Sequence, residues 1–291
     1  MKARRIFSFS VQGITLFIFI YLLIFPKYAA EPTRTALGFC ATALIPGLFI
    51  YMVLAKLIAG SIFMRRIERI LGLEAIALIL GTVCGCPLGA KNALWLYEDG
   101  RITKKQAEYL CSFSNNASLS FVVGFVGGEL LGDIRLGLIL LVFQLIASTV
   151  TAVVMKYLLF CKEGFNVSTQ STYRKTSLWE AISDSGSTMI SLCACVVFFV
   201  VIGEVFTGLI PFSPTWEAVF KSILEFSSGC GTAAEVGKNA FVISAFALGQ
   251  MGASVALQVK SIVGNRLSVR PYIMGKIISG AVMTALAIIF G

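Results

Sequence analysis

The sequence contains no histidine, and only 13% of its 291 residues carry a charged side chain. Without histidine, the commonest general base of enzyme sites and the commonest metal ligand are both missing. The chain also has no Gly-x-Ser-x-Gly nucleophile elbow and no Gly-rich phosphate loop followed by Lys-Ser or Lys-Thr. We therefore expect no enzyme, no metal site and no cofactor.

Hydrophobic residues, in contrast, make up 57% of the chain, and the mean hydropathy is +0.87. A membrane-spanning helix needs about 20 mainly apolar residues, and four stretches of that length contain no charge at all. These stretches are 35–55, 136–155, 185–203 and 239–259. The composition predicts an all-α polytopic membrane protein, because a soluble core helix could explain one such run but not four.

The apolar runs predict about seven membrane crossings. The positively charged N-terminus followed by an apolar run is typical of signal peptides, but we expect an uncleaved first helix because no convincing small-x-small cleavage site follows. The expected crossings lie near 6–25, 36–59, 106–128, 136–160, 184–209, 239–259 and 271–290.

Two further apolar segments, 75–90 and 226–234, are too short to cross and are rich in Gly, Ser, Cys or Pro. Lys91 closes the first and Glu235 closes the second, and we expect both charged side chains to act as interfacial anchors. Irregular backbone is tolerated inside a membrane only within protein or beside a wet cavity. We therefore predict two re-entrant hairpins, at 73–97 and 216–236.

The net charge of +9 serves as a topology signal, because Lys and Arg collect in cytoplasmic loops. With both hairpins in place, the rule puts the N-terminus in the cytoplasm and the C-terminus outside, and reading either hairpin as a crossing spoils the asymmetry. The basic residues then expected on the outer side are Lys27, Arg34, Arg135, Lys221 and Lys238, and the remaining ones are expected on the cytoplasmic side.

An internal repeat follows from this layout, since each half runs helix, re-entrant hairpin, broken helix, helix. Each copy makes an odd number of crossings, so the second must be inverted relative to the first, as in many secondary transporters. The predicted parts are an N-terminal helix and outer loop (1–35), a first repeat (36–161), a cytoplasmic linker (162–177) and a second repeat (178–291).

Polar side chains gather in the middle of the first broken helix, where Ser114, Asn115, Asn116 and Ser118 interrupt an apolar span. Burying amides in hydrocarbon without partners is costly, so they must meet protein groups, water or a ligand. Hydrogen bonding between helices is the alternative to a substrate site. The density of the cluster beside a hairpin favours a substrate site.

The tip of the first hairpin contains Gly85, Cys86, Pro87 and Gly89. Glycine permits tight turns and proline cannot continue a helix, so two half-helices can meet there and present free amide N–H groups to an anion. A simple kink is the alternative. Cys84-x-Cys86 and Cys193-x-Cys195 are weak metal signals, and we expect these cysteines to be packing residues.

The second hairpin offers similar chemistry from the opposite face, with hydroxyl groups added. Its expected binding residues are Ser227, Ser228, Gly229 and Thr232, and Gln250 in the second broken helix is expected to bind substrate as well. Glu225 could accept a proton or a coupling cation, but an interfacial carboxylate at the base of the hairpin is the slightly favoured interpretation.

At these residues the chain resembles a known family, the YlbJ-type sporulation integral membrane proteins, also called SpoVV, which carry the nucleoside-recognition gate domain. The resemblance covers most of 40–290 and rests on an ordered set of motifs. The motifs are Gly85-Cys-Pro-Leu-Gly-Ala90, the linker 99–110, the Ser-Asn-Asn-Ala-Ser stretch 114–118 and Leu224-Glu-Phe-Ser-Ser-Gly229. The resemblance implies a fold similar to concentrative nucleoside transporters, and transport of dipicolinate from the mother cell across the outer forespore membrane.

Three functional hypotheses follow. The first is a transporter for a small organic anion, dipicolinate by resemblance, and the second keeps the fold but carries a nucleoside. The third is a non-transporting scaffold, which predicts silent hairpin tips and sensitive cytoplasmic positions such as Arg65, Arg66 and Lys104. We expect the lipid bilayer and a small anion as partners, no nucleic acid, and leave open assembly into a homo-oligomer.

Overall fold

The computed structural model describes residues 2–59, 61–160 and 176–291, and every regular element within these ranges is helical. Five of the helical runs are long and apolar enough to cross a membrane. They are Lys27–Ile58, Ile134–Leu159, Leu178–Leu209, Gly237–Val263 and Arg270–Phe290. The chain is therefore an all-helical, polytopic membrane protein.

Two of the expected crossings are not among these five runs. The first, 6–25, falls in helix α1 (Lys2–Ile24), whose shorter apolar part is Gln12–Ile24. The other, 106–128, is divided because α7 (Lys104–Ser114) ends at Ser114 and a π-helical segment, η2 (Ser120–Leu130), follows an extended stretch. The backbone breaks where consecutive asparagines offer their side chains as alternative hydrogen-bonding partners to it.

The first half of the chain begins with a long run interrupted by a π-helical bulge, and continues through a short helix into a helix pair. We call the pair α5 and α6 the first hairpin. A capping box, in which the side chains of Thr103 and Gln106 each bond the other's backbone N–H, starts α7. The elements are α2 (Lys27–Phe39), η1 (Cys40–Leu44), α3 (Ile45–Ala59), α4 (Ile62–Leu71), α5 (Leu73–Cys84), α6 (Leu88–Glu98), α7, η2 and α8 (Ile134–Phe160).

Most of the expected linker, 161–175, lies outside the described residues. The second half begins at Leu178, where the Ser177 hydroxyl accepts a bond from the Glu180 amide and caps the helix. We call the pair α10 and α11 the second hairpin. The elements are α9 (Leu178–Leu209), α10 (Pro214–Leu224), α11 (Phe226–Ala234), η3 (Gly237–Asn239), α12 (Ala240–Gln250), α13 (Gly252–Val263) and α14 (Arg270–Phe290).

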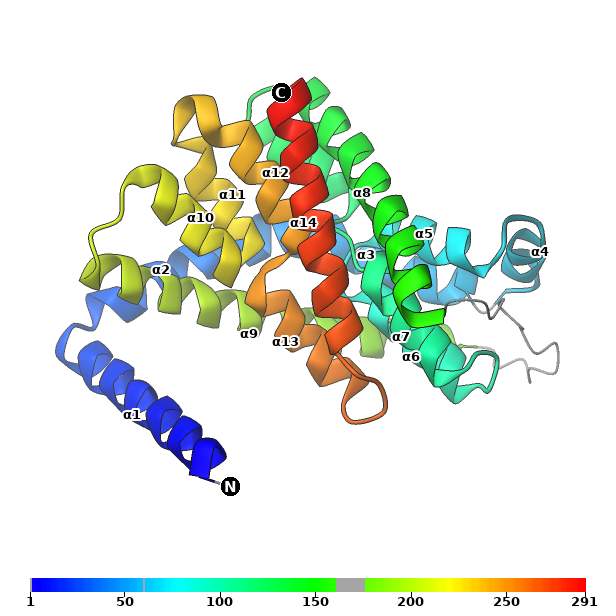
Figure 1. Ribbon diagram of the computed structural model, residues 1–291, viewed down its shortest axis with the longest axis horizontal. Coiled ribbons are helices and arrows are strands. Elements are labelled where there is room, and N and C mark those ends of the chain that lie inside the picture. The colour runs from blue at the N-terminus through cyan, green and yellow to red at the C-terminus, as the bar shows by residue number, and fades with distance from the viewer. Residues whose placement is uncertain (1, 60, 161–175) are drawn as a thin grey trace.

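The two halves thus share one order of elements: a long helix, a helix pair, a broken helix and a long helix. Their contacts also correspond, because α8 packs on α7 and η2 as α14 packs on α12, and the long helices α3 and α9 pack together. Figure 1 shows α8 and α14 side by side and running in opposite directions. The long helices that end the two halves thus pack against each other in antiparallel fashion (Figure 1).

Helix α1 lies apart from the rest of the molecule in Figure 1 and contacts α2 near its C-terminal end. The other helices enclose one large apolar core that draws on both halves. Large apolar side chains remain exposed on the outward faces of the long helices, for example Val142 on α8 and Phe198 on α9. Such exposure suits contact with lipid rather than with water.

Candidate functional site

Two glycines allow the first hairpin to pack closely against the end of α7. A Cβ atom added to Gly81 would lie 1.7 Å from the Ser114 carbonyl oxygen, and one added to Gly89 would lie 2.4 Å from it. Gly85 adopts a φ of 77°, which permits the chain to turn between α5 and α6. The hairpin tip and the break after α7 therefore form one packed unit.

The two asparagines of the break bond the hairpin tip directly. Asn115 Oδ1 accepts from the Ala90 N–H at 2.8 Å and so caps the first turn of α6. The backbone carbonyl of Asn116 accepts from the Cys86 N–H at 2.8 Å. Both asparagines are buried. The free amides expected at this tip are thus partly occupied by the neighbouring break.

The side-chain oxygen of Asn116 collects donors from two other helices. Ser148 on α8 donates to Oδ1 at 3.1 Å, and Lys276 on α14 donates to the same oxygen at 3.1 Å. Gln144 on α8 donates to the Ala117 carbonyl at 3.0 Å. The asparagine cluster therefore connects the long helices of both halves to the first hairpin. This is the structural role that the alternative interpretation, hydrogen bonding between helices, gives to the cluster.

Lys276 lies inside the bundle, where the charge rule led us to expect a cytoplasmic residue. Its side chain is 4% exposed on the inner face of α14, two turns from the start of that helix. Gly275 allows this approach, because a Cβ there would lie 2.1 Å from the Ser112 carbonyl oxygen of α7. Helix α14 begins at Arg270 and already packs on α7 at this level, so Lys276 reaches the interior of the bundle from within the helix.

In the second hairpin, Glu225 forms the connection between α10 and α11. Its Oε2 caps α11 by accepting from the Ser228 N–H at 2.7 Å, and it also accepts from the Ser227 hydroxyl. The residue is 1% exposed, and its Oε1 has no hydrogen-bond partner among the described residues. The interpretation of Glu225 as an interfacial carboxylate at the hairpin base is therefore wrong, because the helix boundary puts it at the tip.

The second broken helix contacts this tip in a similar way. The backbone breaks at Met251, which adopts a left-handed conformation between α12 and α13. Gln250 spans the break, donating to the Ser222 carbonyl of α10 and accepting from the Gly252 N–H at 3.0 Å. An amide side chain at a helix break thus bonds hairpin backbone in each half of the molecule.

Two hollows open along α9, one beside each hairpin. The first hollow, about 410 Å³, is walled by the first hairpin and the N-terminal part of α9. The second hollow, about 850 Å³, is walled by the second hairpin and the C-terminal part of α9. Asp184 lines the first and Val200 the second, and at 1.5 Å per residue they lie about 24 Å apart along the helix.

Charged side chains line both hollows. In the first, Asp184 forms ion pairs with Lys56 and with Lys91, the latter at 2.9 Å, and so joins α3, α6 and α9. Lys91 is thereby a wall residue of the hollow rather than a free anchor. In the second, Lys221 is buried and pairs with Glu204 at 2.6 Å and Glu217 at 2.8 Å.

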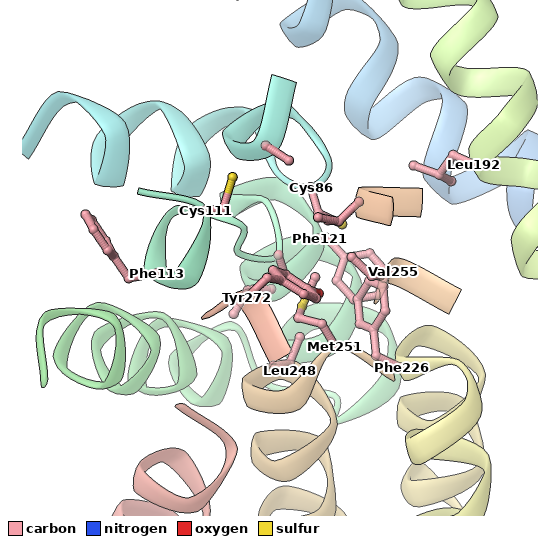
Figure 2. Packing of buried hydrophobic residues seen from close by; sticks show 14 of the residues in the cluster. Cys86, Cys111, Phe113, Phe121, Leu192, Phe226, Leu248, Met251, Val255 and Tyr272 are labelled. Atoms are coloured by element: carbon pink, nitrogen blue, oxygen red, sulfur yellow. The ribbon is translucent and has the colours of Figure 1, made fainter. Parts of the chain in front are cut away.

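Between the hollows the core is closed by apolar side chains from both hairpins and both breaks. Figure 2 shows Cys86, Phe121, Phe226 and Val255 gathered at this place, with Tyr272 from α14 beside them. The rings of Phe121 and Phe226 have centroids 5.2 Å apart. We call this region the partition, since it separates the two hollows along α9.

The sequence-predicted site residues fall into two groups, one around each hairpin, and the first group reaches into the partition with Cys86 (Figure 2). Pro87 lines a smaller hollow of about 220 Å³ that shares Lys91 and Asp184 with the first hollow. Each group is held together by the hydrogen bonds and close contacts of its own hairpin and break. The first group is Gly85, Cys86, Pro87, Gly89, Ser114, Asn115, Asn116 and Ser118, and the second is Glu225, Ser227, Ser228, Gly229, Thr232 and Gln250.

Some members of the two groups line a hollow, whereas others are engaged in contacts inside the protein. Ser227, Ser228 and Thr232 line the second hollow, and Gly229 packs on Ser222. The Ser114 hydroxyl already donates a hydrogen bond to the Leu110 carbonyl, at 2.7 Å. The sequence analysis did not identify two polar residues of the site, Lys276 and Asp184, which both belong to long helices. The only sequence signal for a functional role was that each interrupts an apolar run.

Comparison with curated proteins finds one related to sporulation. The chain is 26% identical to the sporulation integral membrane protein YlbJ of Bacillus subtilis (strain 168) over 151 residues, which is 48% of this chain and 37% of that protein. The match thus covers well under two thirds of the relative's length. No family model matches the chain, and no solved structure matches it. The chain is a relative of a YlbJ-type protein, as its motifs predict.

Proposed function

We propose that this relative of a sporulation integral membrane protein carries a small organic anion across a membrane by exposing one site alternately to its two sides. The observation that supports the proposal is the pair of hollows at opposite ends of α9, each walled by a different hairpin and closed from the other by the partition. Sites between discontinuous helices of two repeats are the rule in secondary transporters.

The anion we propose is dipicolinate, moved from the mother cell across the outer forespore membrane. This identity comes from the family resemblance, and the match to YlbJ supports the connection with sporulation. In the proposed topology the N-terminus is cytoplasmic, so the first hollow opens to the cytoplasm and the second to the outer side. Nucleoside transport by the same fold is the alternative, and a non-transporting scaffold is the third candidate.

Reconstituted transport separates these candidates. The purified chain is placed in liposomes, and uptake of labelled dipicolinate and of labelled uridine is measured over time. Saturable uptake of dipicolinate alone supports the proposal, and saturable uptake of uridine alone supports the nucleoside alternative. Uptake of neither compound by correctly inserted protein refutes transport of both and leaves the scaffold.

Variants at the hairpin then connect transport with the site. Asn115→Ala removes the acceptor of the Ala90 N–H, and Asn116→Ala removes the side chain that bonds Thr82 of the first hairpin and Ser148 of α8, so we expect both to slow dipicolinate uptake several-fold. Asn239→Ala, at an exposed position outside both groups, serves as the matched control and should leave uptake unchanged. Normal uptake by properly inserted Asn115 and Asn116 variants would remove the first group from the mechanism.

A further inference from the structure

The walls of the two hollows do not explain how an anion is recognised. In the first hollow three basic side chains face three acidic ones, and in the second the acidic side chains outnumber the basic ones. The basic residues are Lys56, Lys91 and Arg266 in the first hollow and Lys27 and Lys221 in the second; the acidic ones are Glu98, Glu180 and Asp184, then Glu31, Glu204, Glu217 and Glu235. The groups that bind a negative charge must be sought elsewhere.

One face of α14 carries polar donors where the helix packs inside the bundle. Tyr272, Lys276 and Ser279 are spaced i, i+4 and i+7, so they lie on the same side of the helix. They are 1%, 4% and 2% exposed. Figure 2 shows Tyr272 directed into the partition, near Met251 and Val255.

The three donor side chains have few hydrogen-bond acceptors within reach. The Tyr272 and Ser279 hydroxyls have no hydrogen-bond partner among the described residues. The Lys276 ammonium has one acceptor, the neutral oxygen of Asn116, and no carboxylate in the described ranges forms an ion pair with it. A buried cation without a counter-ion is strongly unfavourable, and a buried hydroxyl without a partner is unfavourable as well.

We propose that Tyr272, Lys276 and Ser279 form the carboxylate-binding subsite of this protein, on the proposed function of anion transport. A carboxylate offers acceptors only, so it supplies the two groups that this face lacks: a negative charge for Lys276 and lone pairs for the hydroxyls. Tyr272 lies beside the partition (Figure 2), and Lys276 bonds Asn116, whose backbone carbonyl bonds the tip of the first hairpin.

Fixed neighbours hold the cation in place. Asn116 Oδ1 also accepts from Ser148, so the oxygen that orients Lys276 is itself fixed from α8. The close contact between Gly275 and Ser112 fixes the height of Lys276 relative to the first hairpin. The subsite therefore selects ligands with at least one carboxylate of small size, and it discriminates against neutral compounds of the same shape.

Binding to the full chain in lipid nanodiscs tests this assignment. Titration calorimetry with pyridine-2,6-dicarboxylate and with its neutral isostere, pyridine-2,6-dicarboxamide, measures the preference for charge. Wild-type protein should prefer the dicarboxylate. In Lys276→Met, affinity for the dicarboxylate should fall roughly tenfold to hundredfold, because a charged hydrogen bond is lost, while affinity for the diamide changes little.

Two further variants test the subsite even if the Lys276→Met protein does not fold. Tyr272→Phe and Ser279→Ala remove hydroxyls that have no hydrogen-bond partner in the described part of the chain, so thermal stability should be unchanged or higher while dicarboxylate affinity falls roughly twofold to tenfold. Lys238→Met, which removes one positive charge at an exposed position on η3, is the control and should bind like wild type.

The outcomes separate the subsite from transport itself. If the folded variants bind the dicarboxylate as tightly as wild type, the subsite is overturned, while transport measured in liposomes can still stand. If wild type binds the dicarboxylate through these residues but moves none of it, the subsite stands and the transport proposal falls. If wild type binds neither compound, both fall together.

Discussion

Substitution of Gly81 by alanine is the sharpest test of the packing between the first hairpin and α7. The added Cβ would lie 1.7 Å from the Ser114 carbonyl oxygen, whereas ordinary contacts begin at 3.4 Å. Helix α5 must therefore move about 1.7 Å away from α7, and because the contact is with backbone, no side-chain rotation relieves it. We expect a loss of at least about 3 kcal/mol in stability.

The assay is thermal unfolding of the purified protein in detergent, followed by loss of the monodisperse fraction. A loss of that size corresponds to a fall of roughly 6–12 °C in the midpoint. Gly186→Ala is the matched control: it is also a helical glycine, but no atom lies within 4 Å of the added Cβ, so the variant should be as stable as wild type or slightly more. Equal midpoints for the two variants would refute the close packing of α5 on α7.

Three further changes test the site. Asn115→Ala leaves the Ala90 N–H without its acceptor, so unfolding in the same thermal assay should show a loss of about 1–3 kcal/mol, and a wild-type midpoint would contradict the cap. Glu225→Gln keeps an oxygen for the Ser228 N–H but cannot titrate, so dipicolinate uptake into liposomes should lose any response to an imposed pH gradient; a retained response would exclude this carboxyl as the coupling group. Asp184→Asn leaves two lysines facing each other, so the midpoint should fall, and fall less in 1 M salt; a loss independent of salt would point to packing instead.

Much of the fold could be predicted from hydropathy and from helix-breaking residues. Long charge-free runs define the crossing helices because the bilayer allows little else. The positions of the breaks could be predicted as well, since consecutive amides after Ser114 and glycines around Gln250 weaken a helix locally. Hydropathy alone treats 106–128 as one continuous crossing, and it does not show that residues 115–118 between α7 and η2 are non-helical.

The partners of the polar side chains could not be predicted, because they come from helices far apart in the sequence. Asn116 bonds Lys276 across 160 residues, and no local pattern connects the two. The charge rule gives Lys276 a side of the membrane but carries no information on whether its side chain points into the bundle. Glu225 was misplaced by its position at a helix boundary, the least reliable feature of any sequence reading.

Helix α9 runs without interruption from Leu178 to Leu209 and forms a wall of both hollows. In the described ranges it has no proline or backbone break that would let its two ends move independently. In the proposed alternating access the helix would act as a lever with its pivot at the partition: tilting that narrows the space at one end would widen the space at the other. The two hollows could then not be open at the same time, because a single rigid helix forms a wall of both, and no further coupling between the two hairpins would be needed.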